Sequence, residues 1–251
     1  MILDMKFFNV YYFCHLANES MGKFEYVRTN SEFNEMCLFK KPKNFPKESI
    51  LRAYCYWLVD RVFYEQINNY QFNEKFLDFN PIMWIQQAIF KYRNIDISVE
   101  EQYDFDYDDC LESYNNYICW IEETFKVCVD EIFYDIATEV EYVLFQNRDF
   151  LLRFNEQISG SFEDDNIERA YIPEWVKRAI LFRDRGKCVF CKRDLSGLNG
   201  ILDDCEKQFD HIVSLDEGGI NDVCNIQLTC KECNNKKLNN SMTSSIYDTA
   251  Y

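Results

Sequence analysis

Four cysteines, one aspartate and one histidine in the last third of the chain have the residue types and spacing of a metal-dependent site. Asp210 and His211 are adjacent, and they lie between two Cys-x-x-C pairs that have 38 residues between them. The cysteines are Cys188, Cys191, Cys230 and Cys233. Paired thiolates favour zinc, and an imidazole beside a carboxylate favours proton transfer near a cation.

The two cysteine pairs predict a closed, tetrahedral zinc site. The two-residue spacer lets both sulfurs of a pair turn toward one ion, and four thiolates leave no open position for a substrate. We therefore expect the zinc to be structural and to stabilise a small unit. Unliganded buried thiols are the plainer alternative. Cys205 and Cys224 lie nearby and are possible substitute ligands, although neither has a paired cysteine.

The segment from about Ile172 to Leu238 resembles the HNH endonucleases. It reads C-V-F-C, then F-D-H-I-V-S-L-D-E-G-G, then N-I-Q-L-T-C-K-E-C-N-N-K-K. The resemblance implies a ββα-metal fold and hydrolysis of phosphodiester bonds in nucleic acid, with DNA favoured over RNA. It covers about a quarter of the chain and leaves residues 1–160 unassigned. A non-catalytic zinc module used for binding is the alternative interpretation.

The resemblance also implies roles for individual residues. His211 matches the general base that takes a proton from the attacking water. Asp210 and Asn234 match the protein ligands of a divalent cation, and their oxygen atoms favour Mg²⁺, or Mn²⁺ in its place. Asn225 matches the family's middle asparagine, whose side chain would bond backbone across the loop and so hold the histidine in orientation. Asn221 is a weaker candidate for that role.

Phosphate contacts are expected from basic side chains of the same region, because nucleic-acid affinity comes largely from the backbone charge. Lys237 lies three residues after Asn234 on the expected final helix, where it is either a phosphate contact or a plain surface lysine. Lys236, Lys192 and Arg193 are the other main candidates. Further basic residues that fit are Lys177, Arg178, Arg183, Arg185, Lys187 and Lys231.

The net charge of −16 belongs to the front of the chain. Residues 171–251 carry 11 Lys+Arg and 12 Asp+Glu, which leaves 16 basic and 31 acidic residues in 1–170. An acidic region repels nucleic acid. We therefore expect it to regulate the nuclease or to bind a protein partner or a second copy, as in a bacterial anti-phage defence effector.

Helical patterns dominate the front region. Residues 1–45 are expected to be irregular, and helices are expected over 52–65, after Pro81, and as one long helix or a helical pair from Leu111 to Leu144. The acidic stretch 96–112 is interpreted as a solvated loop running into a helix, or alternatively as an interaction surface. Behind it, a helix from Pro173, two strands at 208–215 and 225–229, and a helix from Lys231 complete the pattern.

These patterns predict a mainly α N-terminal domain followed by a small α+β domain of the ββα-metal type. The predicted boundaries are an acidic helical domain at 1–160, a linker at 161–171 and an HNH nuclease domain at 172–251. The chain has no run of 18 apolar residues and no signal-peptide pattern. We therefore expect a cytoplasmic protein that does not bind membranes, in which the cysteines stay reduced.

Overall fold

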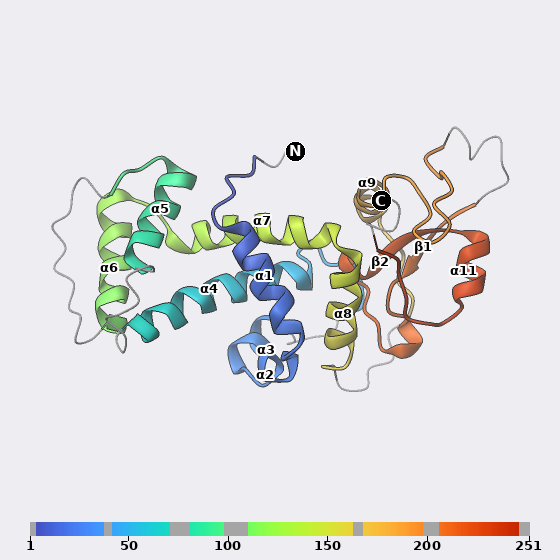
Figure 1. Cartoon of the computed structure of the whole chain (residues 1–251), viewed down its shortest axis with the longest axis horizontal. Helices are drawn as coiled ribbons and strands as arrows, with labels where there is room; N and C mark the ends of the chain where they lie inside the picture. Colours follow the sequence, from blue (N-terminus) through green and yellow to red (C-terminus); the bar gives the residue numbers. More distant parts are fainter. Residues whose placement is uncertain are drawn as a thin grey trace. The chain divides into compact units, whose positions relative to one another are not determined.

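A computed structural model describes residues 4–37, 42–70, 81–97, 110–162, 168–197 and 206–245. Helices predominate among these residues, with one two-stranded sheet (Figure 1). The elements are α1 (Val10–Met21), α2 (Phe24–Arg28), α3 (Ser31–Cys37), α4 (Ile50–Tyr70), α5 (Pro81–Arg93), α6 (Cys110–Phe125), α7 (Val129–Gln146), α8 (Arg148–Ser159), α9 (Glu174–Arg183), β1 (Lys207–His211), η2 (Leu215–Glu217), η3 (Val223–Asn225), β2 (Ile226–Cys230) and α11 (Lys231–Lys237).

The expectation that residues 1–45 are irregular was wrong, because α1, α2 and α3 lie there. In α1 the side chains of Val10, Phe13, Ala17 and Met21 are buried, and their spacing of three to four residues places them on one face. Aromatic and asparagine residues have modest helix propensity, which hid this pattern. Burial of the apolar face outweighs that propensity.

The remaining helical predictions are confirmed with shifted bounds. The segment from Leu111 to Leu144 forms two helices, α6 and α7, separated by a break at Lys126, whose φ is 56°. The acidic stretch was assigned to a loop or an interaction surface, but its residues 98–109 lie outside the described part of the chain. Part of the predicted linker, 163–167, lies outside it too.

The chain divides into two compact units by its internal contacts. One comprises Met1–Phe13 with Cys55–Val140, and the other comprises Cys14–Tyr54 with Glu141–Tyr251. The predicted division into domains at 161–171 stays a prediction. The second unit groups residues 14–54 with the region that carries the cysteine pairs and His211.

The first unit has an aromatic core. Phe63 of α4 stacks on Phe133 of α7 with ring centroids 4.6 Å apart, and Trp84 of α5 meets Phe63 edge to face at 6.0 Å. An ion pair of 2.7 Å joins Arg93 to Asp135 at its surface. Such contacts define a folded helical unit and offer no catalytic group.

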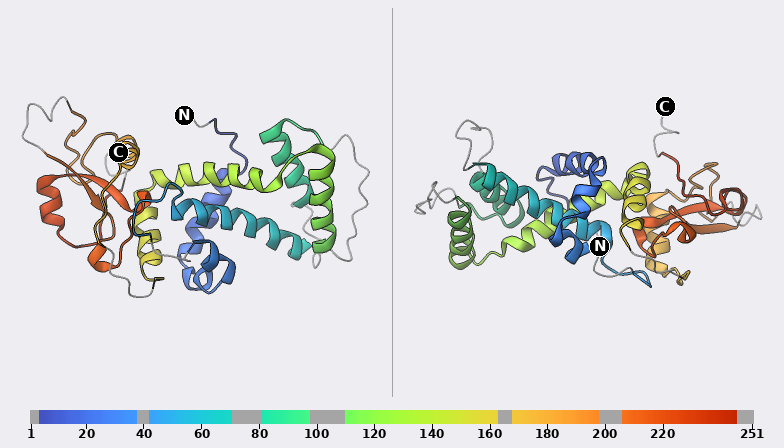
Figure 2. Two further views of the ribbon diagram at one scale, coloured as in Figure 1. Left: turned by 180° about the vertical axis from the view of Figure 1, so that it is seen from behind. Right: turned by 90° about the horizontal axis from the view of Figure 1, so that it is seen from below.

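The second unit contains the predicted ββα arrangement. β1 and β2 form an antiparallel pair in which His211 is opposite Ile226 and Asp210 is opposite Gln227. The helix α11 begins directly after β2 and packs on both strands, as the red and orange segments of Figure 2 show. The expected fold class, mainly α followed by a small α+β ββα domain, is therefore confirmed.

Two glycines shape the loop between the strands. Gly218 has φ of +85°, which a residue with a side chain rarely adopts. At Gly219 an added Cβ would lie only 2.2 Å from the Val213 carbonyl oxygen, so the chain passes itself there too closely for any side chain. The loop therefore folds back on the end of β1, next to His211.

A buried ion network fixes α9 to the sheet. The carboxylate of Asp184 accepts hydrogen bonds from Arg183 Nε at 2.9 Å, Arg148 Nη1 at 3.1 Å and the Leu228 backbone N–H at 2.9 Å. Removing one charge would leave the others buried and unpaired, which is costly. This network therefore holds α8, α9 and β2 in one arrangement.

Among the described residues, no helix is both long and apolar enough to cross a lipid bilayer.

Candidate functional site

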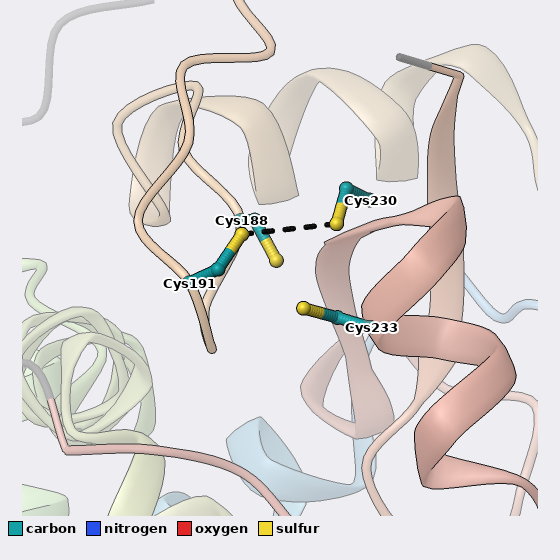
Figure 3. Close-up of side chains that lie close together, drawn as sticks. All are labelled: Cys188, Cys191, Cys230 and Cys233. Carbon is teal, nitrogen blue, oxygen red and sulfur yellow. Dashed lines mark hydrogen bonds between the residues drawn. The ribbon is translucent and has the colours of Figure 1, made fainter.

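The four cysteines of the two Cys-x-x-C pairs converge. Their sulfur atoms all lie within 4.8 Å of one another. Cys188 and Cys191 come from the loop after α9, whereas Cys230 ends β2 and Cys233 lies in α11 (Figure 3). The sulfurs of Cys191 and Cys230 are 3.7 Å apart. Zn–S bonds of about 2.3 Å place the sulfurs of a tetrahedral site about 3.8 Å apart, so this spacing fits zinc.

The ionisation of the thiols also fits a cation. Burial raises the pKa of Cys188, but backbone N–H groups of Cys191, Cys230 and Phe190 outweigh it, so that the pKa is lowered. Burial and the neighbouring thiols raise the pKa of Cys233. Four thiols this close cannot all ionise by themselves, and a divalent cation removes that obstacle.

Cys224, one of the two alternative cysteine ligands, does not join this cluster. Cys224 is buried elsewhere and its thiol donates to Asn155 Oδ1 at 3.5 Å. Burial raises the pKa of Cys224 well above its usual value, as expected for a thiol that behaves as a small apolar group. Cys205 lies outside the described residues.

A second feature is a groove with a volume of about 410 Å³ beside α11. Three residues with predicted chemical roles, Asp210, His211 and Asn234, line it together. Its other lining residues include Arg169, Ser214, Asp216, Asn235, Lys237, Leu238 and Asn239. Strand geometry alone would point Asp210 and His211 to opposite faces. Both nevertheless line this groove, at the last two positions of β1.

Asp210 lies at the groove with one oxygen engaged. Its Oδ2 accepts from Lys237 Nζ at 3.0 Å and from Gln227 Nε2 at 3.2 Å. Its Oδ1 accepts no hydrogen bond from the described residues. One carboxylate oxygen is therefore left for a cation, while Lys237 and Gln227 hold the other in place.

His211 is almost fully buried, with 5% of its surface exposed. Burial is the main cause that lowers the pKa of its imidazole from 6.5 to about 4; hydrogen bonding to Asn221 and the charge of Asp210 oppose it. The ring is therefore neutral at pH 7, the state in which it can accept a proton.

The hydrogen bonds of Asn221 fix which imidazole nitrogen carries the hydrogen. The side-chain nitrogen Nδ2 of Asn221 donates to the backbone oxygens of Lys43 at 3.0 Å and Glu168 at 3.1 Å. Both bonds require an N–H₂ group, so the amide oxygen must face the 3.1 Å contact with His211 Nε2. An amide oxygen only accepts. His211 Nε2 therefore carries the hydrogen, and Nδ1 keeps the lone pair that a base needs.

Asn225, predicted to orient the histidine, bonds the loop backbone. Its Oδ1 accepts from the Val213 N–H at 2.9 Å, and its Nδ2 donates to the oxygens of Val213 and Ile220 at 3.0 Å each. Asn225 thus closes the loop after β1, and its bonds reach the chain two residues past His211. The asparagine that hydrogen-bonds the imidazole is Asn221.

The basic residues predicted to contact nucleic acid lie in different environments. Lys237 is buried, and its ammonium donates to the His211 backbone oxygen at 2.8 Å in addition to pairing with Asp210. Lys192 Nζ donates to the Val189 oxygen at 2.7 Å, Arg193 lies 3.4 Å from Glu232, and Lys236 is exposed on α11. Their phosphate contacts stay predictions.

Arg169 is a groove residue that sequence reasoning missed. It is exposed, and its Nη2 donates to the Phe209 backbone oxygen at 3.3 Å, which holds it beside β1. No motif surrounds it, and it falls in the segment interpreted as a linker. Its positive charge was the one available signal.

The family comparison agrees with this geometry. The family model for HNH endonucleases matches residues 188–240, so this segment is an HNH domain. The match covers both cysteine pairs, Asp210, His211 and Asn234. No curated protein matches the chain. No solved structure matches it either.

Proposed function

We propose that this protein is a metal-dependent HNH endonuclease that hydrolyses phosphodiester bonds in nucleic acid, with DNA as the favoured substrate. The observation that carries the proposal is the groove lined jointly by Asp210, His211 and Asn234. A neutral imidazole, a carboxylate oxygen and an amide oxygen are the groups that cation-assisted hydrolysis requires.

His211 acts as the general base in this proposal. Its Nε2–H is held by Asn221 Oδ1, which leaves Nδ1 to take the proton from the water that attacks the phosphorus. The lowered pKa keeps the ring unprotonated at neutral pH. Asn221 therefore has the same orienting role toward His211 that acceptors have toward catalytic histidines in general.

Asp210 Oδ1 and the side-chain oxygen of Asn234 would hold Mg²⁺, or Mn²⁺. Both are hard oxygen donors, and two protein ligands leave room for water and for phosphate oxygens. When bound, the cation supplies positive charge to the scissile phosphate and to the leaving oxygen. Arg169 is placed to contact a phosphate at the same groove, because it lines the groove and is exposed.

Zinc on the four cysteines would be structural. A four-thiolate site has no open position, and its ligands join the loop after α9 to the end of β2 and to α11. It would stabilise a hairpin and one short helix, elements too small to provide a large core.

Regulation by the acidic helical region is part of the same proposal. The excess negative charge in residues 1–170 disfavours non-specific contact with nucleic acid, so that cleavage by the protein alone would be slow and would be raised by a protein partner, self-association or an activating event. A cytoplasmic anti-phage defence effector has this requirement, since uncontrolled cleavage would damage the host's own DNA.

Nicking of supercoiled plasmid tests the proposal. Zinc-loaded wild-type protein should nick the plasmid with Mg²⁺ or Mn²⁺ and should not do so in metal-free buffer. The variant His211→Ala should lose at least a hundredfold in rate. His15→Ala is the matched control, because His15 is the chain's one other histidine and lies exposed on α1.

Equal nicking by wild type and His211→Ala would remove the proposed mechanism. No nicking by wild type, together with zinc-dependent binding of nucleic acid or a protein, would favour the alternative of a non-catalytic zinc module.

A further inference from the structure

The segment 42–50, called the strap below, runs from the N-terminal part of the second unit to the first turn of α4. It meets the HNH domain at three places that are more than 160 residues away in sequence. They are the contacts of Lys43 with Asn221, of Phe45 with His211, and of Ile50 with Asp222. The first two reach the imidazole of His211, directly or through Asn221, and the third involves the residue that follows Asn221.

The first contact is a hydrogen bond that passes through one side chain to the imidazole. The backbone oxygen of Lys43 accepts from Asn221 Nδ2 at 3.0 Å, while Oδ1 of the same amide lies 3.1 Å from His211 Nε2. An amide is rigid and planar, so a bond on its nitrogen fixes where its oxygen points. The Lys43 backbone oxygen thereby orients the Asn221 amide, and the amide oxygen in turn orients the imidazole of His211.

The second contact is direct. The ring of Phe45 lies against the imidazole with centroids 6.5 Å apart and planes at 30°. Phe45 is buried in the core of the HNH domain together with Val176, Val223 and Ile226. It therefore covers part of His211 with apolar surface and limits how far the ring can turn.

The third contact fixes the far end of the strap. Asp222 is fully buried, and its Oδ2 accepts from the Ile50 N–H at 3.0 Å at the start of α4. Its Oδ1 accepts from the Cys224 N–H at 2.9 Å, at the start of η3. One carboxylate thus satisfies the first turns of two elements and joins α4 to the residue that follows Asn221.

We propose that the strap positions the catalytic imidazole: Lys43 through Asn221, and Phe45 directly, hold His211 in one tautomer and one orientation. The catalytic part of this inference rests on the proposed role of His211 as the base. The strap and Asn221 are positioning residues, since their contacts reach the histidine and not the reacting phosphate. Residues of the N-terminal region therefore complete the nuclease site.

Ordinary core packing is the competing explanation, and it makes a different prediction. If the strap only stabilises the fold, its variants should lower the stability while folded molecules keep the wild-type tautomer and turnover. If the strap positions His211, folded variants should change both.

The first experiment reads the tautomer of His211 by NMR of protein labelled with ¹⁵N-histidine. The chain has two histidines, so the signals of His211 and His15 are separable with the help of His211→Ala. Wild-type protein should show a hydrogen on Nε2 and none on Nδ1. Asn221→Ala and Phe45→Ala should show a mixture of tautomers. Lys47→Ala is the matched control: its side chain is exposed on the same strap and takes part in none of the three contacts, so the wild-type pattern is expected.

The second experiment measures cleavage by the same zinc-loaded variants. Asn221→Ala and Phe45→Ala should lower kcat at least tenfold with KM within twofold, because the strap does not touch the substrate. Lys47→Ala should keep both constants. Where Phe45→Ala does not fold, Phe45→Leu keeps most of the apolar volume but removes the flat ring, and it carries the same test.

A wild-type hydrogen on Nδ1, or folded Asn221 and Phe45 variants with the wild-type tautomer and kcat, would overturn the inference. If wild-type protein cleaves nothing yet its tautomer depends on Asn221 and Phe45, the positioning role stands and the proposed function fails.

Discussion

The ammonium of Lys237 lies 3.0 Å from Asp210 Oδ2, and 2% of the lysine side chain is exposed. This lysine is therefore an internal counter-ion of the carboxylate predicted to bind a cation. Its second bond, to the His211 backbone oxygen at 2.8 Å, joins α11 to the end of β1. One side chain thus connects both residues of the Asp-His pair to the final helix.

Replacing Lys237 should destabilise the HNH domain. In Lys237→Met, Asp210 and the His211 carbonyl lose their shared partner, and the free energy of unfolding should fall by about 2 kcal/mol. The loss is smaller than for a fully buried pair because 16% of the Asp210 side chain stays exposed. Urea unfolding measures the change. Lys236→Met, on the exposed side of α11, is the control and should change it by less than about 0.5 kcal/mol.

Cleavage should persist in mildly acidic solution. Because the pKa of His211 is lowered to about 4, the neutral imidazole predominates at every pH above that value, and protonation removes the base only below it. A cation held beside the ring would lower the pKa further, in the same direction. The single-turnover rate should therefore stay constant from pH 7 to pH 5. A base with the ordinary pKa of 6.5 would lose roughly twenty-five-fold in rate over that range, and such a loss would contradict the burial of the ring.

Zinc should be required for the fold of the HNH domain. One zinc per chain is expected by elemental analysis, and its removal with a chelator should lower Tm and abolish cleavage even after Mg²⁺ is restored. Cys233→Ser should behave like the zinc-free protein. Cys119→Ser, at an exposed cysteine of α6, should behave like wild type. A zinc-free protein with the wild-type Tm would contradict the structural role.

Arg169 should contribute to nucleic-acid affinity through phosphate contact. In the cleavage-deficient His211→Ala background, Arg169→Gln should weaken binding of a DNA duplex and should reduce the slope of log Kd against log salt by about 1. Fluorescence anisotropy at several salt concentrations gives the slope. Arg153→Gln removes the same charge from an exposed position on α8, outside the predicted phosphate contacts, and serves as the comparison. Equal slopes for the two variants would exclude a specific contact by Arg169.

Short-range patterns in the sequence were sufficient to predict the cluster of four cysteines and the ββα order. In each Cys-x-x-C pair, the spacing alone brings two sulfurs to one side of the chain, and the closeness of all four sulfurs follows once β2 pairs with β1. Helices α4 to α7 and α9 followed from apolar residues repeated at helical spacing. The helix α1 was missed because its aromatic residues have modest propensity and are made helical by burial.

The groups around His211 were decided by packing. Asn221 and Asn225 are both within the loop between the strands, and spacing cannot tell which of them meets the imidazole. The close passage of the chain at Gly219 and the hydrogen bonds of Asn225 fold this loop, and the fold brings Asn221 to the imidazole.

The amino-acid sequence by itself determined the metal-binding cysteines, the Asp-His pair and the order of elements, because these depend on residues a few positions apart. The tertiary structure alone decided that Lys237 is buried against Asp210, that Arg169 lines the groove, and that Phe45 covers His211. These contacts join residues far apart in the chain. Their partners are selected by the burial of apolar surface and by the pairing of buried charges, which no local pattern records.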